Sequence, residues 1–159
     1  ILLVYRDIMS VQLIYATTPP ATITQEFLST VLLATLAEID WQPSGDISLA
    51  FVSNQQSRKL NKQFAQNDYA TDVLSFNYDD ENALPSKVVG EIVICSSIAR
   101  SQAKEYKSDF RSEIALLLAH GIMHLSGKDH QNTTTQASFD TAQSAIMKSL
   151  TLNYRTMPW

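Results

Sequence analysis

Cysteine, glycine and proline are scarce in this chain: its 159 residues include one cysteine, four glycines and five prolines. The single cysteine, Cys95, cannot form an intramolecular disulfide, which favours a reducing compartment. With 45% hydrophobic and 18% charged residues, the composition excludes collagen-like, low-complexity and intrinsically disordered sequence. No run approaches the roughly 20 apolar residues that span a bilayer, so a membrane protein is not expected.

An excess of positive charge is also lacking. The chain has 12 Lys and Arg against 16 Asp and Glu, giving a net charge of −4 and an isoelectric point near 5.2. Proteins that bind nucleic acid through a general field are usually basic, so any such contact here needs a local patch. Residues 58–62 contain three cations and no acid, whereas Asp79, Asp80 and Glu81 are wholly acidic.

The pattern of apolar residues predicts one α+β domain, with a small, mostly four-stranded sheet covered by about five helices. Met9 could be an alternative start, so residues 1–9 are interpreted as a candidate N-terminal extension and residues 10–159 as a single domain. Ser96 or Ser97 is expected to cap the third helix. The expected strands are 11–16, 46–52, 71–76 and 88–95, and the expected helices are about 25–36, 54–64, 97–107, 110–125 and 133–150.

All three histidines lie within eleven residues, His120 to His130. His120 and His124 are four residues apart, which places both on one face of a helix. Gly127 lets the chain leave that helix with positive φ and can bring His130 back over the same face. Three neutral imidazoles suit one Zn²⁺ or another divalent transition metal, and leave a fourth position for water, as in catalytic zinc sites. We therefore expect these histidines to be metal ligands and catalytic residues at the end of a buried helix, rather than ordinary polar residues at a helix terminus.

The spacing of the histidines also matches the zinc-peptidase signature H-E-x-x-H-x-x-G-x-x-H. Those enzymes carry a general-base Glu directly after the first His, and this chain has Gly121 there. The sequence therefore keeps the metal site and disfavours peptidase chemistry. Cys95 is interpreted as a small buried hydrophobe rather than a fourth ligand.

Three ordered blocks of this sequence resemble the YbeY-type endoribonucleases and rRNA maturation factors. The family pattern H-G-x-L-H-L-x-G-x-D-H is matched at every fixed position except one, where Met123 replaces Leu. Leu60-Asn61, Asp68 and residues 71–76 resemble the family's L-N…D-x-x-T-D-V-L-S-F stretch, and residues 90–95 resemble its G-D/E-I-x-I strand. The matching motif residues are His120, Gly121, His124, Leu125, Gly127, Asp129 and His130.

This resemblance implies a metal-dependent endoribonuclease whose three histidines, His120, His124 and His130, bind one ion, usually taken to be zinc. It also implies single-stranded RNA as substrate, a role in rRNA maturation and ribosome quality control, and ribosomes or ribosomal proteins as partners. A cytoplasmic location is expected, without membrane or DNA as partners.

One departure from the family pattern concerns an arginine that usually follows the aromatic residue after L-N, because Ala65 stands there. A guanidinium would bind phosphate and offset transition-state charge. Arg58, Lys59 and Lys62 could substitute for it, although a solvent-exposed helix face is favoured for them; Lys128 is a further candidate. The loss leaves a second hypothesis, a non-catalytic ribosome-associated factor that binds metal, and a weaker third one, a zinc peptidase. Structural roles are favoured for Asp72 and Glu91, whereas Asp129 is expected either to orient a histidine ligand or to cap the turn.

Overall fold

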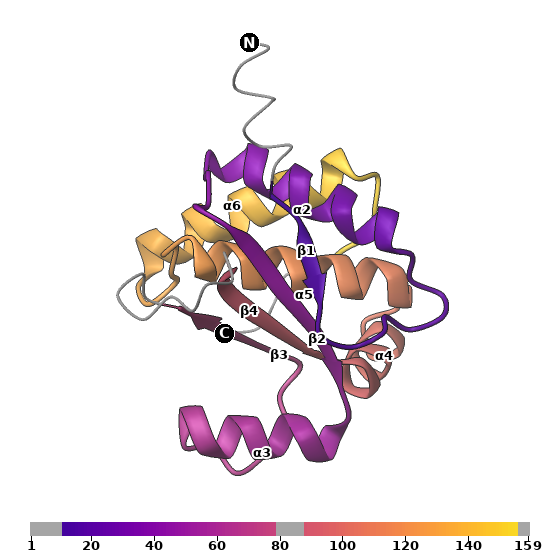
Figure 1. Ribbon diagram of the computed structural model, residues 1–159. Coiled ribbons are helices and arrows are strands. Elements are labelled where there is room, and N and C mark those ends of the chain that lie inside the picture. Colours follow the sequence, from indigo (N-terminus) through magenta and orange to yellow (C-terminus); the bar gives the residue numbers. More distant parts are fainter. Residues whose placement is uncertain (1–10, 79–87, 156–159) are drawn as a thin grey trace.

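The computed structural model describes residues 11–78 and 88–155, and within them it contains one four-stranded sheet and five helices (Figure 1). This agrees with the expected α+β fold. The proposed extension at residues 1–9 and the acidic run Asp79-Asp80-Glu81 lie outside the described residues. The strands are β1 (Leu13–Tyr15), β2 (Asp46–Val52), β3 (Val73–Asn77) and β4 (Val88–Cys95). The helices are α2 (Gln25–Ile39), α3 (Asn54–Ala65), α4 (Ser96–Glu105), α5 (Phe110–Leu125) and α6 (Thr133–Ser149).

The sheet has the strand order β1-β2-β4-β3. Strands β1, β2 and β4 run parallel, whereas β3 is antiparallel to β4 and forms an edge of the sheet. In register, Leu49 of β2 pairs with Ile92 of β4, which in turn pairs with Ser75 of β3. Because side chains alternate along a strand, these three residues share one face of the sheet.

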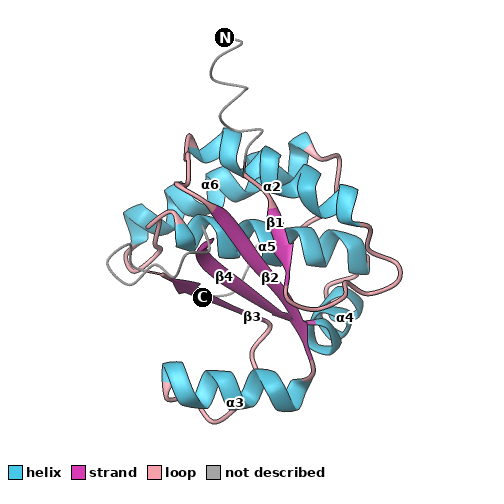
Figure 2. Cartoon of the chain, viewed as in Figure 1, coloured by secondary structure: helices cyan, strands magenta, loops and turns pink. Residues whose placement is uncertain are grey.

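Helix α5 covers this face: Ile92 lies next to Gly121, and Leu125 lies next to Gly90. Helices α2, α4 and α6 pack against α5, and α3 lies across the opposite face of the sheet (Figure 2). On that opposite face, the Cys95 thiol donates to Asn54 Oδ1 of α3, and the rings of Phe64 and Phe76 meet edge to face. The core therefore lies between the sheet and the layer built around α5. No helix among the described residues has the length and apolar character needed to cross a membrane.

Helix α5 is the buried helix expected from its apolar sequence, and 13 of its 16 residues are buried. Asp109 caps it, because Asp109 Oδ1 accepts a hydrogen bond from the Ser112 backbone amide at 2.9 Å. At its other end Gly127 adopts a φ of 81°, the Gly127 amide bonds to the His124 carbonyl, and the Lys128 amide bonds to the Met123 carbonyl. This pair of bonds is a Schellman motif, which turns the chain back after the helix.

Two sequence predictions about element ends were wrong. Helix α4 has Cys95 as its N-cap residue with no side-chain capping bond, because β4 runs directly into the helix and Ser97 Oγ donates instead to Asn54. Strand β3 begins at Val73 rather than residue 71, because Asp72 Oδ1 accepts the Val73 amide and the Thr71 backbone bonds to the Ser57 hydroxyl.

Candidate metal centre

His120, His124 and His130 come together as the sequence predicted. One ring nitrogen from each lies within 4.8 Å of the others. The Nε2 atoms of His120 and His124 are 3.0 Å apart. Two nitrogen ligands of a tetrahedral zinc lie roughly 3.3 Å apart, which follows from Zn–N distances of about 2.0–2.1 Å. The separation of His120 and His124 is therefore close to that of two ligands on one such ion.

The turn after α5 delivers the third histidine. Following Gly127, the Asp129 carboxylate accepts the backbone amide of His130 at 2.7 Å. The ring centroid of His130 then lies 5.0 Å from that of His124 and 5.7 Å from that of His120. Asp129 thus shapes the turn, one of the two roles expected for it from the sequence.

Phe139 of α6 forms the floor of the cluster. Its buried ring lies 5.1 Å from the His120 centroid and 5.2 Å from the centroids of both His124 and His130. An aromatic floor excludes water from one side of the imidazoles and restricts their rotation. The sequence analysis assigned no role to Phe139.

Burial favours the neutral forms of His120 and His124. The pKa of His120 falls to about 3, first because the ring is desolvated and then because of the neighbouring His124 and His130 charges, while its interaction with the Gln143 side chain opposes the shift. Burial and the charge of His130 also lower the pKa of His124, which Asp129 partly opposes. Neutral imidazole is the form that binds metal, so both rings are in the competent protonation state at neutral pH.

A cavity of about 360 Å³ opens between this cluster and the edge strand β3. His120 and His124 meet one side of it, and the strand supplies the other. The Ser75 hydroxyl ties the two sides together by donating to the Gly121 carbonyl at 3.3 Å. The residues lining the cavity are Val73, Leu74, Ser75, Asn77, His120 and His124.

Gly121, the position of the peptidase general base, is packed against the sheet. A Cβ atom built there would lie 2.9 Å from Ile92 Cγ2 and 3.1 Å from Ser75 Oγ. A glutamate at this position has no room for its side chain without displacing α5 from the sheet. The chain therefore lacks both the residue and the space for that base at this position.

The cations considered as replacements for the family arginine lie on exposed surface. Arg58 Nε and Lys62 Nζ pair with the two oxygens of Asp68 at 2.7 and 2.8 Å. These partners hold the pKa of Asp68 at about 2. Ala65 is exposed at the last residue of α3, and Lys128 is exposed in the turn before His130.

Three further residues that the sequence singled out lie in structural networks. Asp72 accepts from the Gln102 side chain at 2.9 Å, and Glu91 accepts from the hydroxyls of Ser48 and Tyr78. Cys95 is buried at the end of β4, and its thiol donates to Asn54 of α3. Because side chains alternate along a strand, Cys95 lies on the face of the sheet opposite Ile92 and α5, away from the histidines, so it is not placed as a fourth ligand.

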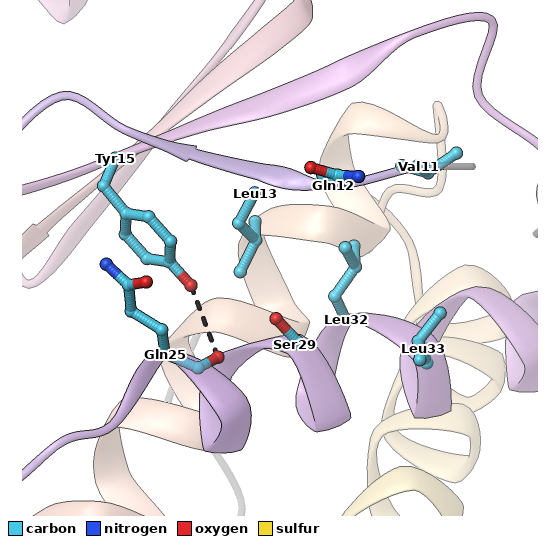
Figure 3. A pocket seen from close by; sticks show the side chains of 8 residues that line it. All are labelled: Val11, Gln12, Leu13, Tyr15, Gln25, Ser29, Leu32 and Leu33. Atoms are coloured by element: carbon cyan, nitrogen blue, oxygen red, sulfur yellow. Dashed lines mark hydrogen bonds between the residues drawn. The ribbon is translucent and has the colours of Figure 1, made fainter. Parts of the chain in front are cut away.

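A second cavity, of about 320 Å³, lies between β1 and α2 at the other edge of the sheet (Figure 3). The Tyr15 hydroxyl donates to the Gln25 carbonyl across it. None of the eight residues that line it is a histidine, cysteine or carboxylate, so these residues provide no comparable metal ligands. They are Val11, Gln12, Leu13, Tyr15, Gln25, Ser29, Leu32 and Leu33.

Comparison with protein families matches residues 16–151 to the family described as Endoribonuclease YbeY. The chain belongs to this family. Among curated YbeY endoribonucleases, the protein of Alkaliphilus oremlandii is 36% identical over 130 residues, which cover 80% of this chain and 86% of that protein. The protein of Alkaliphilus metalliredigens is 40% identical over 111 residues, covering 67% of this chain and 72% of that protein.

A solution structure of a Thermotoga maritima protein has the same fold. It covers 89% of this chain and 91% of its own chain, with a TM-score of 0.56 and 23% sequence identity. The resemblance to the YbeY family inferred from the three sequence blocks is thus confirmed, as is the single α+β fold.

Proposed function

We propose that this chain is a metal-dependent endoribonuclease that cleaves single-stranded RNA, with precursor rRNA as its natural substrate. The observation that carries the proposal is the convergence of three imidazoles beside an open cavity, in a chain of the YbeY endoribonuclease family. The proposed partners are ribosomes or ribosomal proteins in the cytoplasm, and neither DNA nor a membrane is expected. Residues 10–159 form the proposed single hydrolase domain.

The proposed ligands of the ion are His120, His124 and His130, and zinc is the proposed metal. Three imidazole nitrogen donors fit a borderline transition metal, and they leave one position of a tetrahedron for water or substrate. When bound, such an ion polarises a phosphodiester oxygen and makes water acidic enough to attack near pH 7. The family resemblance and the donor set support this assignment.

The cavity beside β3 is the proposed place for the scissile phosphodiester. His120 and His124 line one side of it, and Asn77 offers a side-chain amide as a hydrogen-bond donor on the other. The Ser75 hydroxyl is committed to the Gly121 carbonyl, which holds the strand against the helix that carries the histidines. These residues bind and orient the RNA backbone, while Phe139 keeps water away from the far side of the imidazoles.

The decisive test is His124→Ala, compared with the control Thr141→Ala on the exposed face of α6. His124→Ala is expected to remove both the bound metal, measured by elemental analysis, and cleavage of a single-stranded RNA. Thr141→Ala is expected to retain both. Full RNA cleavage by a metal-free His124→Ala protein would overturn the proposal.

The non-catalytic alternative rests on Ala65, which stands where the family pattern has arginine. Ala65→Arg separates the two functions, because a guanidinium there would bind phosphate and stabilise transition-state charge. A natural protein with little RNA cleavage that gains a large rate with Ala65→Arg would support the non-catalytic factor. A natural protein that cleaves RNA readily supports the nuclease. The third alternative, a zinc peptidase, predicts casein digestion by the metal-loaded protein, and no digestion is expected.

A further inference from the structure

Strand β3 has one edge that no other strand of the described sheet covers. It lies at the end of the strand order, so β4 is its neighbour on one side only. The Asp72 carbonyl accepts from the Cys95 amide of β4. At the other end of the strand, the Tyr78 amide donates to the Val89 carbonyl. In an antiparallel pair, residues whose backbone groups face the partner strand alternate with residues whose groups face away. The residues of β3 that face away from β4 are Val73, Ser75 and Asn77.

This open edge faces the candidate metal centre. Its first amide is already satisfied, because Val73 N–H donates to Asp72 Oδ1 at 2.8 Å. For the amides of Ser75 and Asn77, residues 11–78 and 88–155 provide no hydrogen-bond partner. Both residues line the cavity of about 360 Å³ whose other side is formed by the histidines of α5. The edge therefore presents backbone donors and acceptors to the proposed place of cleavage.

The chemistry of this edge favours a nucleobase over a phosphate. The Ser75 carbonyl and the Asn77 amide point the same way and form a neighbouring acceptor and donor. A phosphate group only accepts, so it would leave the Ser75 carbonyl unpaired, and neither lysine nor arginine lines the cavity to compensate. The Watson–Crick edge of a base carries a donor beside an acceptor, as N6–H and N1 do in adenine. Such an edge satisfies both backbone groups at once.

Asn77 also lies level with the histidines. In register it pairs with Gly90 of β4, and Gly90 packs against Leu125, which directly follows His124 in α5. Asn77 is exposed, so this end of the edge opens to solvent, where the rest of an RNA strand can leave the cavity. A base at β3 and a phosphodiester at the histidines can therefore belong to neighbouring parts of one strand.

We propose that the Ser75 carbonyl and the Asn77 amide bind the Watson–Crick edge of an unpaired base of the substrate. This inference rests on the proposed function, because the base belongs to the RNA that is cleaved. In a duplex the Watson–Crick edges are occupied by the other strand, so the open edge of β3 selects single-stranded RNA. Every RNA base carries a donor beside an acceptor on this edge, so the contact selects for an unpaired base rather than for one sequence.

Three small probes separate the base from the phosphate. AMP carries a free Watson–Crick edge, N6,N6-dimethyl-AMP keeps the ring and the phosphate but blocks that edge, and ribose 5-phosphate lacks the base. Their affinities are measured by NMR titration of the ¹⁵N-labelled, zinc-loaded full chain, which also reports the Asn77 amide proton. Asn77→Pro replaces the outward N–H by a methylene without breaking a bond to β4. Asn77→Ala is the matched control, because it removes the same side chain and keeps the N–H.

We expect the natural protein to bind AMP about 3–10-fold more tightly than the other two probes, and the Asn77 amide proton to shift downfield with AMP alone. Asn77→Ala is expected to keep this preference and Asn77→Pro to lose it. Equal affinity of the natural protein for AMP and N6,N6-dimethyl-AMP overturns the inference, even where Asn77→Pro fails to fold. So does an Asn77→Pro protein that keeps the preference. A natural protein that prefers AMP but leaves single-stranded RNA uncleaved overturns the proposed function instead.

Discussion

Substituting alanine for Gly121 sets two effects against each other at the closest approach of α5 to the sheet. In a helix interior, alanine is about 1 kcal/mol more favourable than glycine. The added methyl, however, would lie 2.9 Å from Cγ2 of Ile92, a fully buried side chain on the central strand β4. Adding a methyl to a tightly packed core costs about 1–3 kcal/mol.

The upper part of that range applies here. Cγ2 is attached directly to the branched Cβ of Ile92, so it cannot swing away as the end of a flexible side chain could. Ser75 Oγ, at 3.1 Å, blocks a second direction of relief. We therefore expect Gly121→Ala to lower the free energy of unfolding by about 1–2 kcal/mol, and Tm by roughly 3–6 °C in a domain of this size.

A double-mutant cycle measured by urea denaturation of the metal-free protein tests this explanation. Ile92→Ala removes both side-chain methyl groups near Gly121, so Gly121→Ala in that background is expected to be neutral or stabilising. The expected coupling free energy is about 2 kcal/mol. The same loss of stability in both backgrounds would refute the steric explanation, and so would a gain in stability with Ile92 intact.

Three other predictions concern charged and metal-binding groups. His120 takes up a proton below about pH 6.5 in the unfolded chain but only near pH 3 in the native protein. Lowering the pH from about 7 to 5 should therefore reduce the free energy of unfolding of the metal-free protein by about 2 kcal/mol, measured by urea denaturation. A free energy of unfolding that does not change over this range would contradict the burial of a neutral ring. Metal should be released as the pH falls well below about 6.5, and retention at about pH 4, measured by dialysis and elemental analysis, would contradict an all-histidine site. Arg155→Met leaves the 1% exposed Glu113 carboxylate without the guanidinium that lies 2.8 Å away, and should lower the free energy of unfolding by about 3–5 kcal/mol, measured by thermal denaturation. Arg58→Met removes a cation from an exposed pair and should cause no measurable loss of stability. Equal effects of the two substitutions would show that burial of the ion pair is unimportant.

Local signals in the sequence predicted much of the fold. Strand β4 and helix α5 have the bounds predicted for them, because a segment rich in apolar, β-branched residues and the Asp109 cap are each encoded within a few residues. The cap of α4 was predicted incorrectly because Ser97 bonds to Asn54, a residue 43 positions away. Such a contact depends on how α3 packs on the sheet, which local sequence does not specify.

The same distinction holds at the metal centre. The spacing of the three histidines and the glycine turn predicted the cluster, because helix geometry alone relates His120 to His124. Phe139 could not be assigned a role, because it reaches the cluster only through the packing of α6 on α5.

The buried pair of Glu113 and Arg155 has a consequence for the order of events during synthesis. Glu113 lies in the first turn of α5, seven residues before His120, and burial raises its pKa although Arg155 opposes this shift. Until Arg155 has emerged from the ribosome, the nascent chain can bury this turn only by stranding a carboxylate without its guanidinium or by keeping it protonated. The sheet is synthesised before α5, but the helix that carries two of the three histidines reaches full stability only 42 residues after Glu113 has been added. Late completion of this helix would delay assembly of the histidine cluster until Arg155, which follows α6, has been added.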